Sequence, residues 1–214
     1  MASGAPATPG SPPGLTPSPG PGTGPTVPSV APYFWRMTSL SLPRPAADEF
    51  NPFYAGYVAK VPDGDVVKFL ETQLREVRSL LSTIPEGRGG HAYAPGKWTI
   101  KEVIGHMCDA ERIFAYRALR IARKDATPLA GFEQNDYVPA GQFGKRTMAS
   151  LVDEVVQVRD ATLSLVRTFD AEAGARRGTA SGKEVSVRAL VYIIAGHMAH
   201  HVTVLREQYG VGAK

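Results

Sequence analysis

The sequence predicts an all-α protein, a four-helix bundle with a long crossover between its second and third helices. Apolar residues recur every three or four positions over four long segments, which is the period of an amphipathic helix. Residues that cap helices precede several of these segments, and no segment shows the convincing alternation of a strand. Of the 214 residues, 43% are hydrophobic, which is enough for one packed domain.

Residues 1–36 differ in composition from the rest of the chain. Proline, glycine, serine, threonine and alanine dominate, and Arg36 is the only charged side chain. Such a segment buries too little apolar surface to offset its ordering entropy, so we expect a disordered Pro/Gly-rich tail. It lacks the apolar core of a secretory signal. A simple hypothesis is that translation starts at Met37, directly after this tail.

Residues 37–64 are expected to form an N-terminal arm, and residues 65–210 the bundle domain. The arm carries an aromatic patch that includes Phe50, Phe53, Tyr54 and Tyr57, and we expect it to pack on the domain. The first helix begins after residues 63–65 and ends before residues 85–90. Its apolar stripe consists of Val66, Val67, Leu70, Leu74, Val77 and Leu81.

The second helix begins at a capping box formed by Thr99 and Glu102 and runs to about residue 124. Residues 127–146 lack regular periodicity and are too many for a tight turn, so we expect them to cross over one end of the bundle. Thr147 caps the third helix, and residues 174–182 form a polar turn. Ser186 caps the fourth helix, which ends near Tyr209.

Two histidines lie on the inward stripe of the fourth helix. His197 and His201 are one turn apart, on the same face as Leu190 and Ile194. A polar group on such a face costs free energy unless it is satisfied, and one metal ion would satisfy both rings. The alternative is a pair of hydrogen-bonded core histidines. His200 lies off this axis and is left out of the ligand set.

His106 adds a third imidazole at the edge of the stripe of the second helix, and Glu111 lies on the opposite edge. Three protein ligands with one open position are typical of a catalytic metal site. Imidazole ligands suit zinc, nickel, iron or cobalt, so the ligand set alone does not select the metal.

Several segments together resemble the DinB-like family of metal-binding four-helix bundles. They are residues 94–106, which end in Gly-His, residues 109–112, residues 128–132, and residues 195–201, which contain Gly-His-x-x-His-His. The resemblance covers roughly residues 49–209. It implies that His106, His197 and His201 hold a divalent transition metal. Relatives include S-transferases that use bacillithiol or mycothiol, and members described only as metal-dependent hydrolases; many form dimers.

The resemblance implies a metal-dependent enzyme, a thiol S-transferase or hydrolase acting on small electrophilic molecules in stress or detoxification. The alternative is a non-catalytic metal-binding stress-response protein. Relatives often have glutamate where this chain has Met198. Glu111 is the candidate to orient a ligand or move a proton, and its alternative is an ion pair with Arg112 or Arg117. Asp136 and Tyr137 are weaker candidates for substrate contact, for which ordinary loop packing is favoured.

The net charge of +4 is mild and interleaved, so nucleic-acid binding is not expected. The densest basic group, from Arg117 to Lys124, reads as the charged last turns of a helix.

The single cysteine, Cys108, reads as a small buried hydrophobe and indicates a reducing compartment, hence the cytoplasm. No apolar run reaches the length of a membrane helix. We expect a small-molecule substrate, and a homodimer by resemblance.

Overall fold

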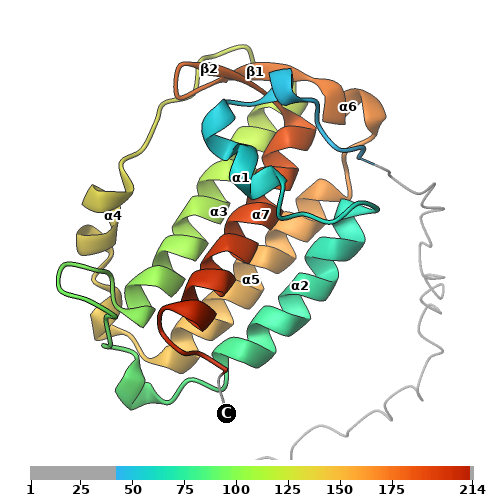
Figure 1. Cartoon of the computed structure of the whole chain (residues 1–214). Coiled ribbons are helices and arrows are strands. Elements are labelled where there is room, and N and C mark those ends of the chain that lie inside the picture. Colours follow the sequence, from blue (N-terminus) through green and yellow to red (C-terminus); the bar gives the residue numbers. More distant parts are fainter. Residues whose placement is uncertain (1–41, 213–214) are drawn as a thin grey trace, which may run out of the picture. The chain divides into compact units, whose positions relative to one another are not determined.

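Four long helices form a bundle in this computed structural model, which describes residues 42–212 (Figure 1). They are α2 (Val66–Leu81), α3 (Ile100–Ala122), α5 (Met148–Val166) and α7 (Val187–Glu207). Helix α3 packs against α7 and α5, and α2 packs against the same two helices, so α2 and α3 occupy opposite corners. The predicted bundle is confirmed. The expected tail of residues 1–36 and the start at Met37 lie outside the described residues.

The predicted caps fix where the helices begin. Thr99 and Glu102 form a full capping box, in which the Thr99 amide donates to the Glu102 carboxylate at 2.7 Å. The Thr147 and Ser186 hydroxyls accept from amides three residues on, at 3.1 and 3.0 Å. Each cap satisfies a backbone N–H that the first helical turn leaves unpaired.

A β-hairpin stands where the sequence predicted a polar turn without strands, so that prediction is wrong. Helix α6 (Ala171–Ala175) is followed by β1 (Arg177–Ala180) and β2 (Lys183–Ser186), which pair antiparallel. The two turn residues, Ser181 and Gly182, have φ values of 53° and 71°. Positive φ at both positions gives a turn whose twist matches that of paired strands. Strands of four residues with little alternation carry almost no sequence signal.

The crossover between α3 and α5 also differs from the prediction. It contains α4 (Gln134–Gly141) and a 3₁₀ turn, η4 (Phe143–Lys145), where no regular structure was expected. It runs along the side of the bundle from the hairpin to the opposite end, rather than over one end (Figure 1). The crossover therefore lies beside α3 over much of its length, and α4 and η4 both pack on α3.

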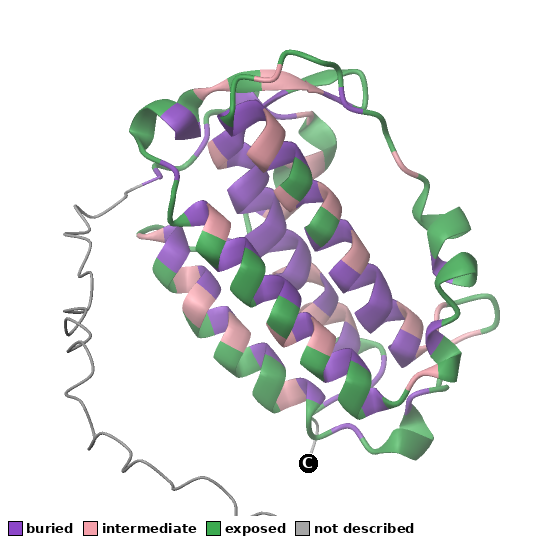
Figure 2. Cartoon of the chain, turned by 180° about the vertical axis from the view of Figure 1, so that it is seen from behind, coloured by how far each residue is buried: buried purple, intermediate pink, exposed green. Residues whose placement is uncertain are grey.

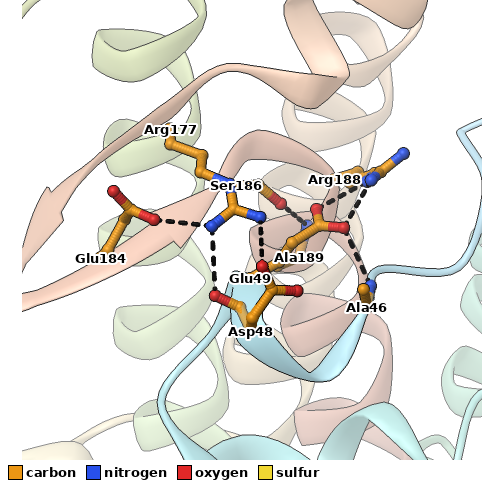
Figure 3. Close-up of polar contacts among 8 residues, drawn as sticks. All are labelled: Ala46, Asp48, Glu49, Arg177, Glu184, Ser186, Arg188 and Ala189. Atoms are coloured by element: carbon orange, nitrogen blue, oxygen red, sulfur yellow. Dashed lines mark hydrogen bonds and ion pairs between the residues drawn. The ribbon is translucent and has the colours of Figure 1, made fainter.

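The arm consists of short turns η1 (Ala47–Glu49), η2 (Pro52–Tyr54) and α1 (Ala55–Val58), and α1 packs on α7. A further 3₁₀ turn, η3 (Glu86–Arg88), follows α2. Ion pairs fasten the arm (Figure 3). Arg188 of α7 donates to Glu49 at 2.6 Å, and Arg177 of β1 donates to Asp48 at 2.9 Å.

These contacts shift the acidity of Glu49. Burial alone would raise its pKa, but hydrogen bonds from Arg188, the Ala46 amide and Ser186 outweigh burial and lower the pKa to about 2. The carboxylate is therefore held ionised against the bundle. This anchor fixes the position of the aromatic residues that follow it in the arm.

The core divides into two apolar clusters along the bundle axis. The first cluster contains the apolar residues of α3 that follow Cys108 and those of α7 that precede Gly196. The second contains the apolar residues of α3 up to and including Cys108 and those of α7 from Met198 onward. Buried residues face inward along each helix (Figure 2). Near the boundary between the clusters lies a set of buried polar side chains: Gln73, His106, Glu111, Arg159, Thr162, His197 and His201. These seven buried polar residues thus form a central layer of the bundle. No helix within residues 42–212 is long and apolar enough to cross a membrane.

Candidate metal centre

Three buried imidazoles converge in the central polar layer. The Nε2 atom of His197 lies 3.1 Å from Nε2 of His106 and 3.1 Å from Nε2 of His201. Helix α3 supplies the first ring and one face of α7 the other two, as the i, i+4 spacing predicted. Within residues 42–212 this is the one group of three or more potential ligands whose donor atoms all lie within 4.8 Å of one another.

The surroundings keep all three rings neutral near neutral pH. Burial lowers the pKa of His106 to about 4 and that of His201 to about 3. Burial, together with the neighbouring histidines, lowers the pKa of His197 well below its ordinary value. A neutral imidazole has one nitrogen with a free lone pair, which is the form that binds a metal.

Hydrogen bonding among the rings does not account for this geometry. Each Nε2 carries either one hydrogen or one lone pair, so Nε2 of His197 can make one good hydrogen bond but faces two partners. Nδ1 of His201 is buried and has no hydrogen-bond partner in the described chain. Nitrogens that bind one tetrahedral ion at about 2.0–2.1 Å lie about 3.3 Å apart. Nε2 of His197 lies 3.1 Å from each of the other two, and all three donor atoms lie within 4.8 Å of one another. The donor set therefore fits a single divalent transition metal.

Two glycines allow the crossover and the arm to pack closely against α3 and α7 next to the histidines. Gly105 precedes His106, and a Cβ there would lie 2.3 Å from the Phe143 ring of the crossover. Gly196 precedes His197, and a Cβ there would lie 1.9 Å from the Tyr57 carbonyl oxygen of the arm. Both Gly-His pairs thus combine a ligand with a point of close approach. The arm and the crossover form walls of the same site.

Two cavities reach the histidines from different sides. The aromatic cavity, of about 290 Å³, borders His106 and His197 and is walled by rings of the arm, α3 and the crossover: Phe53, Tyr54, Tyr57, Phe114 and Phe132. The tryptophan cavity, of about 280 Å³, borders His200 and His201 and contains Trp98, Tyr93 and Tyr209. Asn135 of α4 lines both. The triad is therefore bordered by two cavities, one at His106 and His197 and the other at His201.

Glu111 does not lie free beside the histidines. Arg159 of α5 donates to both of its carboxylate oxygens, at 2.7 and 2.9 Å, and both side chains are buried. Arg159 also donates to Gln73 at 2.8 Å, and the Gln73 amide donates to the Ala195 carbonyl at 2.9 Å. We call Gln73, Glu111 and Arg159 the arginine brace. The ion pair expected as an alternative for Glu111 exists, but its partner is Arg159 rather than Arg112 or Arg117.

Other residues singled out in the sequence have ordinary surroundings. Asp136 and Tyr137 are exposed on α4, and the Tyr137 ring packs 5.5 Å from that of Phe132. Cys108 is buried, which raises the pKa of its thiol. Met198 is buried in the second apolar cluster. Arg117, read from the sequence as part of a charged helix end, is instead 3% exposed, because its side chain turns under the crossover and the hairpin.

Several residues that shape the site were not identified from the sequence. The Tyr57 ring lies 5.4 Å from that of His197, and the Trp98 ring lies 4.9 Å from that of His106. Glu133 and Asn135 line the aromatic cavity. Arg159 had a usable signal, because it continues the row of Val155, Thr162 and Val166 on the inner face of its helix. Glu133 and Asn135 had none, since their position depends on the path of the crossover.

Comparisons with known proteins agree with this architecture. The family model of the DinB superfamily matches residues 70–205. The structure is similar to YfiT from Bacillus subtilis, described as a probable metal-dependent hydrolase with an unusual four-helix bundle topology. The TM-score is 0.60 at 14% identity over 71% of this chain and 91% of that one.

The structure is also similar to a mycothiol-dependent maleylpyruvate isomerase, with a TM-score of 0.58 at 14% identity over 73% of this chain. This chain spans 64% of that protein's length. At such low identity, both likenesses show the fold alone. Among curated proteins, none matches this sequence significantly.

Proposed function

The chain belongs to the DinB superfamily, and we propose that it is a metal-dependent enzyme, a thiol S-transferase or hydrolase that acts on small electrophilic molecules. The observation that carries this proposal is the convergence of three buried Nε2 atoms on a common point. His106, His197 and His201 would hold a divalent zinc, nickel or iron ion. The ion would act as a Lewis acid that makes a thiol or water nucleophilic near neutral pH.

The protein's own groups would position the reactants. The ring edges and faces of Tyr57, Phe114 and Phe132 offer an apolar wall beside His106 and His197 and exclude water from one side. The tryptophan cavity opens on His201 and carries a polar rim that includes Lys97 and Asn135. Two cavities at one centre suit a reaction between two small molecules, which favours transfer to a thiol over hydrolysis. The single cysteine supports a reducing, cytoplasmic location, and homodimerisation stays a prediction.

Two observations favour the alternative of a non-catalytic metal-binding protein. Both oxygens of Glu111 are engaged by Arg159, and Asp109 lies 3.8 Å from Arg112 in an ion pair. The resemblance to the family also implies that Met198 stands where relatives often have glutamate. The carboxylate that lines the aromatic cavity is that of Glu133, which is exposed and caps α4 by accepting from the Asn135 amide at 2.9 Å. A reaction that needs a buried carboxylate base would therefore be slow in this protein.

The test begins with the metal content of untagged protein, wild type beside His197→Ala. We expect about one equivalent of metal in the wild type and a loss of affinity above 100-fold in the variant, since changes to groups that merely support a ligand cost 10–100-fold. The loaded protein is then assayed for conjugation of a low-molecular-weight thiol to 1-chloro-2,4-dinitrobenzene, and for hydrolysis of 4-nitrophenyl acetate.

The outcomes separate the candidates. Conjugation that His197→Ala abolishes supports the transferase, and ester hydrolysis with the same dependence supports the hydrolase. Stoichiometric metal with neither activity supports the non-catalytic alternative. A wild-type protein that binds no divalent metal contradicts all three.

A further inference from the structure

A second buried cation, Arg117 of α3, lies against two rings that wall the aromatic cavity, those of Phe114 and Phe132. Its side chain is 3% exposed. Nη2 donates to the Ala130 carbonyl of the crossover at 2.7 Å and to the Ser181 hydroxyl of the hairpin turn at 3.0 Å. Its guanidinium carbon lies 5.9 Å from the centroid of the Phe114 ring and 5.8 Å from that of Phe132. All these partners are neutral.

Within the described part of the chain, no acidic side chain compensates the charge of Arg117. No carboxylate within residues 42–212 forms an ion pair with it, and residues 1–41 contain no aspartate or glutamate. The other fully buried guanidinium, that of Arg159, meets both oxygens of Glu111. Burial of a charge is costly unless an opposite charge accompanies it. Two neutral oxygens and two ring faces replace lost hydration only in part.

A small cavity gives an anion access to this cation. It measures about 50 Å³ and is lined by Arg117, with Asn51 of the arm and Ser181 and Lys183 of the hairpin. Glu184, also in the lining, is taken up by Arg177 at 2.7 Å. Since a site for one water needs about 10–15 Å³, this space suits a group of three or four heavy atoms such as a carboxylate. A guanidinium is the side chain best matched to such a group.

The small cavity and the aromatic cavity share part of their walls. Phe53 and Tyr54 of the arm line both of them. The Phe114 ring connects the two ends, because it lies 5.9 Å from the His197 ring and beneath the guanidinium of Arg117. A ligand with a flat apolar body could thus lie along these rings with one end at the histidines and the other at Arg117.

We propose that Arg117, Asn51 and Ser181 form a subsite for the carboxylate of an aryl or other flat unsaturated acid whose body occupies the aromatic cavity. The proposal rests on the function proposed above and names the class of electrophile: a small apolar acid rather than a neutral molecule. Arg117 would be a specificity-determining residue, which binds the substrate at the end remote from the reacting atoms.

The test measures binding to the full chain by titration calorimetry. The probes are phenylacetate and 3-phenylpropionate, each beside its neutral amide, and inorganic phosphate alone. Wild-type protein should bind at least one acid about 10-fold more tightly than its amide, a difference of about 1.4 kcal/mol. Arg117→Met should abolish that preference. Arg120→Met is the matched control, because it removes one positive charge from the same helix where Arg120 pairs with Asp125 at the surface; it should retain the preference.

The same titrations on His197→Ala, with no added metal, separate this proposal from the metal site. A preference for acids that survives in His197→Ala and disappears in Arg117→Met supports the subsite, even if the metal proposal fails. A preference lost in His197→Ala but kept in Arg117→Met puts the carboxylate at the histidines and overturns the subsite. Equal binding of every acid and its amide by the wild type overturns it too, and this comparison needs no variant to fold. Phosphate that binds as tightly as the acids would make the site one for a free anion and also overturn it.

Discussion

The arginine brace and the histidine triad are two buried polar regions in the same central layer of the bundle, and they differ in how far the protein satisfies them. In the brace, Arg159, Glu111 and Gln73 meet one another and the Ala195 carbonyl within hydrogen-bonding distance. In the triad, Nε2 of His197 faces Nε2 of both His106 and His201 but can form a good hydrogen bond with only one of them. A polar cluster that is complete stabilises the fold, whereas one that is incomplete is available to a ligand.

Arg117 sharpens this contrast, because it is nearly as buried as Arg159 (3% against 1% exposed) but pairs with no carboxylate of the described chain. The bundle therefore contains two differently placed buried guanidinium groups. That of Arg159 is neutralised by Glu111 between α3 and α5, and that of Arg117 faces a cavity. Mutations in the brace should change stability first, and mutations around the triad and Arg117 should change binding first.

The largest expected effect is on the brace. Glu111→Ala leaves the Arg159 guanidinium buried and unpaired, so the free energy of unfolding should fall by about 3–5 kcal/mol. Chemical denaturation followed by circular dichroism measures this loss. Glu71→Ala is the matched control, because Glu71 pairs with Arg167 at the surface at 2.6 Å and should cost about 0–1 kcal/mol.

Replacing both partners, Glu111→Met with Arg159→Met, should recover most of the stability, since a buried ion pair can often be exchanged for apolar groups of similar volume. Metal affinity should then stay near that of the wild type. A Glu111→Ala protein as stable as the control would contradict the assignment of Glu111 to the fold. Loss of activity in a stable, metal-loaded Glu111→Gln protein would restore Glu111 as a catalytic candidate.

A smaller effect is expected where the arm meets the triad. Gly196→Ala puts a Cβ 1.9 Å from the backbone oxygen of Tyr57, which cannot rotate away, so the arm must move. We expect a loss of about 1–3 kcal/mol in the free energy of unfolding and faster proteolysis within residues 50–60. Gly56→Ala is the control on the arm itself, where a Cβ meets nothing within 4 Å. Equal proteolysis of the two variants would show that the arm does not depend on this contact.

The smallest effect concerns the anchor of the arm. Glu49 has a pKa of about 2 in the folded protein against an ordinary value of 4.5. Its contribution to the free energy of unfolding is therefore fully present above pH 4.5 and is lost as the pH falls from there toward about 2. Because Arg188 is partly exposed, we expect a contribution of about 1–2 kcal/mol. The stability difference between wild type and Glu49→Gln should shrink over that pH range, whereas exposed Glu76→Gln should show no such trend. A constant difference down to pH 2 would contradict the role of Glu49.

The sequence predicted the four helices well because periodicity and caps are local properties. Thr99 with Glu102, Thr147 and Ser186 all cap as expected, and the spacing of His197 and His201 alone places both rings on one face. The short hairpin and α4 were missed, since four-residue strands and an eight-residue helix containing Pro139 give weak local signals.

The burial of Arg117 could not be derived from local pattern alone, and neither could the partner of Arg159, although the inner row of its helix places Arg159 toward the core. In sequence Arg117 is an ordinary arginine on an amphipathic helix. The environments of the two arginines are decided by the crossover that covers Arg117 and by Glu111, which stands 48 residues from Arg159 in the chain. The walls of the aromatic cavity likewise come from the arm and the crossover, which the hydrophobic pattern did not place relative to α3 and α7.

The most direct test of the central claim is the anomalous scattering of a crystal of the full chain grown with Zn²⁺, recorded at the zinc absorption edge. We expect one strong peak per chain, about 2.0–2.1 Å from Nε2 of His106, His197 and His201. A peak elsewhere, or three rings that turn apart to hydrogen-bond other groups while the surrounding bundle stays intact, would contradict it.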